Sequence, residues 1–392
     1  MGVRQTLARV SAGGAHVQVV EVAGHWVLRA GLERRIVERG WRLSQSPADA
    51  DVLAVCGVPG TDLAAYVERI WDQLPGPRVR VDVVDSAGLV EALDEAAVVL
   101  LDTAAHDEDS RRRPSSPGPA PDDRDMDDMD DMDDMDDMDD MDDMDDMDDM
   151  DDMEMAPGGI ALAEGGEDRD GLEMDVLHVQ LGPVLGHWPA GLVLWCDLQG
   201  DVIVDATASV IDGDDDTRGV ADDNPAHAAA RCSDAASSVL ALAGWPDAAT
   251  AARRIRDFLL APPPSGAAPP PSGVAPPALD RLEGLERKVR RSRILRWSLR
   301  DLGILTPDNL KRRGLPDELG GDVGDRLLSM IGRAKSLHAG DPGSLAPRQD
   351  SSAAVMEALP DLITGLDLAA ARLVVASLCL EPVTARRRVA HG

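Results

Sequence analysis

The stretch ADVLAVCGVPGTDLAAYVERIWDQLPGPRVRVDVVD, residues 50–85, decides the fold of the first part of this 392-residue chain. An apolar run ends in a Gly-Pro turn, an amphipathic helical pattern follows, and a second apolar run closes the stretch. Residues 15–24 add an earlier buried strand, and residues 29–40 add a helix that ends at a glycine. Strand–helix–strand alternation with continuous apolar strands predicts an α/β domain with a parallel sheet over residues 1–105.

The turn that follows the strand at residues 52–55 lies where parallel sheets bind ligands, at the carboxyl ends of the strands. Its sequence, CGVPG (residues 56–60), lacks the GxGxxG spacing. This departure argues against a dinucleotide cofactor.

Two low-complexity segments divide the chain. Residues 106–159 contain a Met-Asp-Asp repeat whose period of three matches neither a helix nor a strand, and we expect a disordered acidic tether. The repeat is either a metal-capturing segment, through thioethers or carboxylates, or a solvated product of repeat expansion, which we favour. Residues 261–277 (APPPSGAAPPPSGVAPP) predict a semi-rigid proline-rich linker.

The C-terminal part is predicted to be α+β. LGPVLGHWPAGLVLWCDLQGDVIVDA, residues 181–206, indicates a glycine- and proline-rich turn followed by a β-hairpin. The hairpin and the first helices occupy residues 160–260, and a mainly helical region occupies residues 278–392.

Composition excludes several functions. The net charge is −33, and residues 122–152 hold 21 aspartates against Arg124 alone, so we expect no nucleic-acid partner. The basic run at residues 287–300 carries apolar residues at helical spacing, and we expect it to lie on an anionic partner or in solvent. No apolar run is long enough to span a membrane, and four scattered cysteines fit a reducing cytoplasm.

Residues 40–81 resemble the family that unites the hydrogenase small subunit with its relative in NADH-quinone oxidoreductase (complex I). The likeness rests on the Ser-Pro before the strand, on ADVL, on the turn glycine and on WDQLPGPR. The resemblance implies a [4Fe–4S] cluster held by four cysteines. Here VAGHWVLRAG (residues 22–31) stands where the first two would be, no later pair follows, and Cys56 alone cannot hold a cluster.

The later segments resemble the quinone-binding subunit of complex I, which is the relative of the hydrogenase large subunit. They are GPVLGHWPAGLVLWCDLQGDVIVDA (residues 182–206), residues 224–259, GGDVGDRLLSMIGRAKSL (residues 320–337) and residues 359–383, in the family's order. The resemblance implies a quinone-binding turn histidine, but Ala190 and Leu185 stand at the histidine positions and His187 is offset. We expect His187 to be a turn imidazole bonded to backbone, and Asp325 and Arg326 to form an ion pair within the helix or between domains.

These departures predict a fusion of two degenerate modules that keeps their mutual interface. His25, Cys56 and His187 mark degenerate positions, and we expect no catalytic residue, no metal site and no cofactor. The CGVPG and GPVLGHWPAG turns should face each other across an apolar junction filled by His25, Trp26 and Trp188.

The function expected from the resemblance is that of a non-catalytic pseudo-subunit, cytoplasmic and peripherally bound to the membrane. It would couple the membrane subunits of a complex I-like or antiporter-like assembly, which translocates protons or other ions, to a soluble partner. The first alternative is a catalytic quinone oxidoreductase subunit of the NADH dehydrogenase type, completed by ligands from a partner chain. The second is a metal-binding scaffold built on the Met-Asp repeat.

Overall fold

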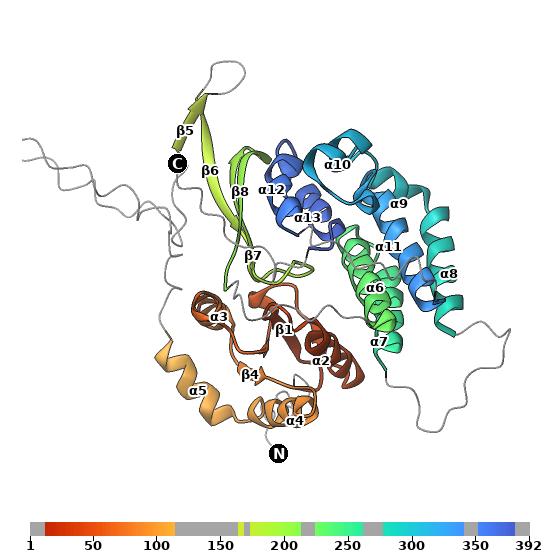
Figure 1. Cartoon of the computed structure of the whole chain (residues 1–392). Coiled ribbons are helices and arrows are strands. Elements are labelled where there is room, and N and C mark those ends of the chain that lie inside the picture. The colour runs from red at the N-terminus through yellow and green to blue at the C-terminus, as the bar shows by residue number, and fades with distance from the viewer. Residues whose placement is uncertain are drawn as a thin grey trace, which may run out of the picture.

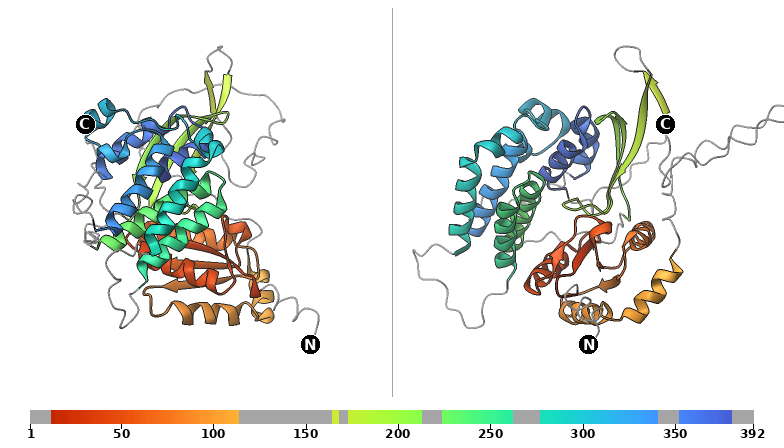
Figure 2. Two further views of the ribbon diagram at one scale, coloured as in Figure 1. Left: turned by 90° about the vertical axis from the view of Figure 1, so that its right-hand side faces the viewer. Right: turned by 180° about the vertical axis from the view of Figure 1, so that it is seen from behind.

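The computed structural model describes residues 12–113, 164–167, 173–212, 224–261, 277–340 and 352–380. Figure 1 shows three groups of elements: an α/β domain, an antiparallel sheet and a helical region. In Figures 1 and 2 the α/β domain lies below, and the antiparallel sheet and the helical region stand side by side above it.

The α/β domain is built on a parallel sheet of order β2-β1-β3-β4. The strands are β1 (His16–Glu21), β2 (Arg42–Leu43), β3 (Val52–Cys56) and β4 (Val79–Val83). All five residues of β3 are buried, because its alternate side chains enter two different cores. Val52, Ala54 and Cys56 face one core, and Leu53 and Val55 face the other.

Helices cover both faces of this sheet. α2 (Trp26–Glu38) and α4 (Leu89–Val99) pack on one face, and α3 (Thr61–Gln73) packs on the other. The predicted parallel α/β sheet is confirmed. The helix predicted from residue 29 begins three residues earlier, because Trp26 is buried and belongs to the first turn.

The boundary predicted for the acidic tether needs correction at its beginning. α5 (Thr103–Arg112) extends into the segment expected to start at residue 106. The side chain of Asp102 accepts hydrogen bonds from the backbone N–H groups of Ala104 and Ala105, which begins this helix with an N-cap. The rest of the predicted tether, residues 114–159, lies outside the described residues, as do residues 262–276 of the proline-rich linker.

The second sheet is antiparallel, with the order β5-β6-β7-β8. Its strands are β5 (Glu164–Glu167), β6 (Glu173–Leu181), β7 (Leu192–Gln199) and β8 (Val202–Val210). The predicted turn at residues 182–191 connects β6 to β7, and β7 and β8 form the predicted hairpin. One face of this sheet packs against the helices, and its buried side chains include Leu192, Leu194 and Ile203.

The helical region shares one core with this face of the sheet. Its helices are α6 (Pro225–Leu242), α7 (Pro246–Leu260), α8 (Pro277–Arg291), α9 (Arg293–Ser298), α10 (Pro307–Arg313), α11 (Val323–His338), α12 (Ser352–Ile363) and α13 (Leu368–Ser377). α6 packs against α7 and α11, and α8 packs on the outer side of α11. The mainly helical C-terminal region with a small antiparallel sheet is therefore present.

The end of the described chain closes onto the hairpin. The Ile203 N–H donates to the Leu366 carbonyl at 2.9 Å, and the Gly365 N–H donates to the Ile203 carbonyl at 2.7 Å. The connection between α12 and α13 thus pairs with β8 across more than 160 residues of sequence. Within the described parts of the chain, no helix has both the length and the apolar character needed to cross a membrane.

Candidate functional site

The junction between the α/β domain and the rest of the chain is the candidate site. Trp26, at the start of α2, is only 9% exposed and belongs to the core of the hairpin and helices, not to the core of its own domain. The Arg231 guanidinium lies over its indole at 4.7 Å from the centroid, and the His227 ring meets it edge-on at 6.5 Å. Trp26 therefore fixes the beginning of α2 to α6.

His25, one of the degenerate positions, lies beside the CGVPG turn. Its Nδ1 hydrogen-bonds with the Ala23 carbonyl at 3.3 Å. Gly57 has a φ of +102°, and a Cβ placed there would come within 2.8 Å of the His25 ring. Glycine at position 57 thus allows the turn to pass directly against the imidazole.

The CGVPG turn meets the end of the hairpin at Asp212. The Asp212 carboxylate accepts hydrogen bonds from the N–H groups of Asp62 (3.1 Å) and Leu63 (2.8 Å), at the first turn of α3. Its neighbour Ile211 donates to the carbonyl of Gly191, the last residue of the other turn. A carboxylate from the hairpin therefore caps a helix of the α/β domain, and the two predicted turns meet through it.

The turn at residues 182–191 also contacts the α/β domain directly. Val184 packs with Ile211 against the core on the α3 face of the parallel sheet. Just before the turn, the amide of Gln180 donates to the Tyr66 hydroxyl on α3 at 2.5 Å. Trp188 packs instead on the core of the hairpin and helices, where its Nε1 donates to the Leu192 carbonyl at 2.8 Å.

His187 occupies the left-handed region of the backbone, with a φ of 63°. Its side chain was expected to bond to backbone, but the structure corrects this: none of the described residues forms a hydrogen bond with its ring. Burial lowers the pKa of His187 to about 4, and the charges of Glu33, Arg253 and Asp234 have smaller effects on it. The imidazole is therefore neutral at pH 7 and stands beside a set of buried charges.

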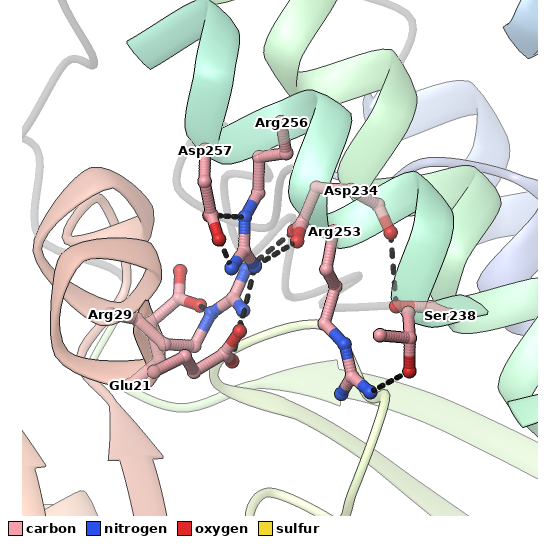
Figure 3. A network of polar contacts seen from close by, with 9 residues as sticks. Glu21, Arg29, Asp234, Ser238, Arg253, Arg256 and Asp257 are labelled. Carbon is pink, nitrogen blue, oxygen red and sulfur yellow. Dashed lines mark hydrogen bonds and ion pairs between the residues drawn. The ribbon is translucent and has the colours of Figure 1, made fainter. Parts of the chain in front are cut away.

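Arg29 on α2 is the first centre of these charges (Figure 3). It donates through Nε to Glu21 at the end of β1, and through Nη1 to Glu33 on its own helix at 2.5 Å. Its Nη2 donates to Asp234 on α6 at 2.5 Å. One guanidinium thus binds carboxylates from both sides of the junction.

Arg256 on α7 is the second centre and is 1% exposed. Its Nη1 donates to Glu33 at 2.6 Å and to Asp234 at 2.7 Å, while its Nη2 lies 2.8 Å from the neighbouring Asp257. Glu33 and Asp234 therefore each bridge the two arginines. We call the set formed by Glu21, Arg29, Glu33, Asp234, Arg256 and Asp257 the junction network.

The junction network contains more carboxylates than guanidinium groups. Burial alone would raise the pKa values of Glu33 and Asp234, but the two arginines outweigh it and hold both pKa values below their usual range. Burial prevails at Glu21 and Asp257, whose pKa values are raised. The excess negative charge is therefore relieved by favouring protonation of these two side chains.

The junction network corrects the prediction of an apolar junction. An isolated buried charge costs several kcal/mol, and for this reason we expected aromatic side chains to fill the junction. Here each guanidinium has three carboxylate partners within hydrogen-bond distance, so the cost of burial is offset by pairing. Of the aromatic candidates, Trp26 crosses the junction, whereas Trp188 lies within the hairpin side.

A cleft of about 840 Å³ opens beside the junction network, between α2, α7 and α8. Glu33, Arg256 and Asp257 form its inner wall, and Phe258 lies under the guanidinium of Arg281 at 4.9 Å. The network therefore has one side close to solvent.

The cysteines lie on separate elements. Cys56 and Cys196 are buried, and burial raises the pKa of the Cys56 thiol to about 12 and that of Cys196 to about 11. Both thiols are therefore protonated at pH 7. In the part of the chain that the structure describes, no group of three or more His, Cys, Asp or Glu side chains is placed to hold a metal ion.

Asp325 and Arg326 do not form the expected ion pair, and neither lies at the junction. Asp325 completes a capping box with Asp322 at the start of α11. Arg326 points into the helical region, where it donates to Ser377 and to the carbonyls of Gly303, Leu319 and Gly321. Adjacent helical positions point about 100° apart, so these two side chains serve different surroundings.

The junction network itself was not predicted from the sequence. Arg29 and Glu33 have the i, i+4 spacing of an ordinary exposed ion pair on a helix surface. Their partner Asp234 lies 205 residues away from Arg29 in sequence. Only the placement of α6 and α7 against α2 reveals that this pair is buried.

Compared with known proteins, the chain matches no family model and none of the curated proteins.

Proposed function

We propose that this chain is a non-catalytic structural subunit of a complex I-like assembly that translocates protons or other ions. In this proposal the α/β domain corresponds to the complex I relative of the hydrogenase small subunit. The hairpin and the helical region together correspond to the relative of the hydrogenase large subunit. The chain couples the membrane part of the assembly to a soluble partner.

The observation that carries the proposal is the way in which the α/β domain docks. Among the contacts that hold it, three lie on different elements: Trp26 in the opposite core, Asp212 on α3, and the junction network. Contacts at three points prevent one domain from rotating on the other, so a displacement at one end is transmitted to the other. Rigid transmission is the property that a coupling subunit needs.

The chemistry of the inherited positions supports a structural role. A [4Fe–4S] cluster takes four cysteine thiolates held close together, whereas the four cysteines of this chain lie on separate elements. A group that protonates a quinone must hold a proton near neutral pH, whereas the pKa of His187 is lowered to about 4. Both Cys56 and His187 fit packing at the junction better than redox chemistry.

The test is purification of the tagged full-length chain from gently solubilised membranes of the cells that make it. We expect antiporter-like membrane subunits to co-purify in constant stoichiometry. Removing the chain should abolish ion translocation by membrane vesicles and leave electron transfer by the soluble partner in place. A chain that purifies alone as a monomer, or that reduces quinone by itself, would contradict the proposal.

A further inference from the structure

A rigid apolar projection lies at the outer edge of the helical region. Ile294 and Trp297 on α9 are 79% and 76% exposed, the highest values among the described large apolar side chains. They lie three residues apart on one side of the helix, while Leu295 and Leu299 are buried in the core below. The side chain of Ser292 caps the helix by accepting from the Leu295 N–H, so the projection is held in place.

The same segment is the most basic part of the described surface. Residues 287–300 contain seven exposed basic side chains and no carboxylate: Arg287, Lys288, Arg290, Arg291, Arg293, Arg296 and Arg300. Arg290 is paired with Glu286 of its own helix, whereas no ion pair with another described residue involves the other six. In Figures 1 and 2, α8 and α9 lie on the side of the helical region away from the antiparallel sheet.

We propose that the surface formed by residues 287–300 docks directly onto an anionic lipid bilayer, with Ile294 and Trp297 entering the headgroup region. Tryptophan is favoured at the boundary between headgroups and acyl chains because its ring is apolar and its N–H is polar. Clustered arginines are attracted to anionic headgroups at the same depth. The apolar pair and the arginines alternate within one short helix, so both can engage a flat surface together.

This occupant fits better than an acidic protein or a nucleic acid. Either polymer would satisfy the arginines but would need a complementary pocket for two protruding apolar side chains. A fluid bilayer accepts them without such a pocket. Lys288 at one end of this surface lines the cleft beside the junction network, whereas Ile294 and Trp297 lie on α9, which contributes no residue to that cleft. Docking through α9 does not depend on the proposed coupling function.

The experiment is co-sedimentation of the full-length chain with vesicles of phosphatidylcholine alone or mixed with phosphatidylglycerol. We expect binding to the anionic vesicles only, weakening as salt is raised. Trp297→Ser should reduce the partition coefficient roughly tenfold, because a large apolar side chain no longer leaves water. Each of Arg293→Gln and Arg296→Gln should reduce it roughly fivefold.

Two matched controls separate this surface from general effects. Val98→Ser removes an apolar side chain that is 70% exposed on the α/β domain, and Arg34→Gln removes an exposed arginine on α2. Both should bind vesicles like the unchanged chain. All the variants should unfold within a few degrees of the unchanged chain, because each changed side chain is exposed.

Absence of binding to anionic vesicles would overturn the inference, as would equal binding to phosphatidylcholine. Binding that survives Trp297→Ser and Arg296→Gln would also overturn it. A chain that binds only after deletion of residues 125–153 would show that its own acidic repeat occupies the surface, which also contradicts docking by the intact protein. The vesicles contain only lipid, so none of these results tests the coupling function.

Discussion

Arg256 and Arg326 are both about 1% exposed, yet they lie in opposite electrostatic surroundings. Arg256 faces the carboxylates of Glu33 and Asp234; although burial lowers its pKa, these carboxylates raise that pKa above its ordinary value. Arg326 meets neutral acceptors, and burial lowers its pKa to about 10. Its Nη2 has no hydrogen-bond partner among the described residues.

The difference shows what each arginine does for the fold. The charge on Arg256 is matched by charges from another element, so it holds two parts of the molecule in a fixed relation. The planar guanidinium of Arg326 donates to carbonyls of different loops within the helical region and so holds those loops together. The role of Arg256 depends on complementary charge, and the role of Arg326 depends on the number of its N–H donors.

The largest effect is expected from Arg256→Met. The change leaves Glu33 and Asp234 sharing only Arg29, so buried negative charge is no longer compensated. We expect a loss of roughly 3–5 kcal/mol in the free energy of unfolding, measured by urea denaturation. Arg34→Ala, which breaks an exposed pair with Glu38, is the control and should cost about 1 kcal/mol or less. Equal effects of the two changes would mean that the junction network is solvated.

Arg326→Met should have the next largest effect. It removes the donor to the carbonyls of Gly303 and Leu319, whereas the Gly321 carbonyl still accepts from the Leu305 N–H. The expected loss is roughly 2–4 kcal/mol because unsatisfied buried acceptors are costly. Hydrogen exchange should increase at the loops that hold these carbonyls and should not increase in α2. Faster exchange in α2 would show that the two arginine sites are not independent.

Acid should destabilise the junction through His187. Its pKa is about 4 in the folded chain and near 6.5 when unfolded, so stability is complete above pH 6.5 and falls as the pH decreases toward 4. After allowance for partial exposure, the loss is about 2 kcal/mol. The raised pKa of Glu21 acts in the opposite direction, since its penalty is relieved as the pH falls.

His187→Asn isolates this contribution, because asparagine tolerates the left-handed backbone and does not titrate. The variant should show a flatter dependence of unfolding free energy on pH between 6.5 and 4. An unchanged slope would place the acid sensitivity in another group.

Asp212→Gly tests the helix cap that crosses the junction. Glycine suits the φ of 50° and removes only the carboxylate, so the expected loss is about 1 kcal/mol. Asp212→Asn keeps one acceptor and should lose less. If both variants match the unchanged chain in thermal unfolding, the cap does not stabilise the docked arrangement.

Deletion of residues 125–153 is expected to have the smallest effect. A segment of Met and Asp residues with no apolar periodicity contributes little buried surface, so the unfolding temperature should stay within a few degrees. A larger decrease, or loss of a tightly bound metal from the purified chain, would favour the metal-binding interpretation of the repeat.

The parts of the fold that were predicted correctly are those with strong local patterns. The apolar runs of β1, β3 and β4 and the amphipathic helix α3 all carry their signal within ten to fifteen residues. β2 has two residues and was missed because so short an edge strand shows no periodicity. α4 was missed as well, although its buried residues Leu89, Leu93 and Ala96 recur at helical spacing.

The candidate site was predicted only in part, because its chemistry is not local. Trp26 was selected for its size, and size does correlate with burial. The junction network depends on α2, α6 and α7 meeting, and charged residues on helices are usually solvated. Arg326 was placed with Asp325 because the two are neighbours in sequence, although they project in different directions.

The pairing of Gly365 and Asp367 with β8 has a consequence for the order in which the chain acquires its structure during synthesis. The hairpin emerges from the ribosome more than 160 residues before the segment that covers its edge. At typical translation rates that delay is roughly 10–30 s, during which an unpaired strand edge is open to other chains. The strands and helices of the α/β domain are close together in sequence, so we expect this domain to fold first. It would then contact one side of the hairpin while the C-terminal helices are still being synthesised.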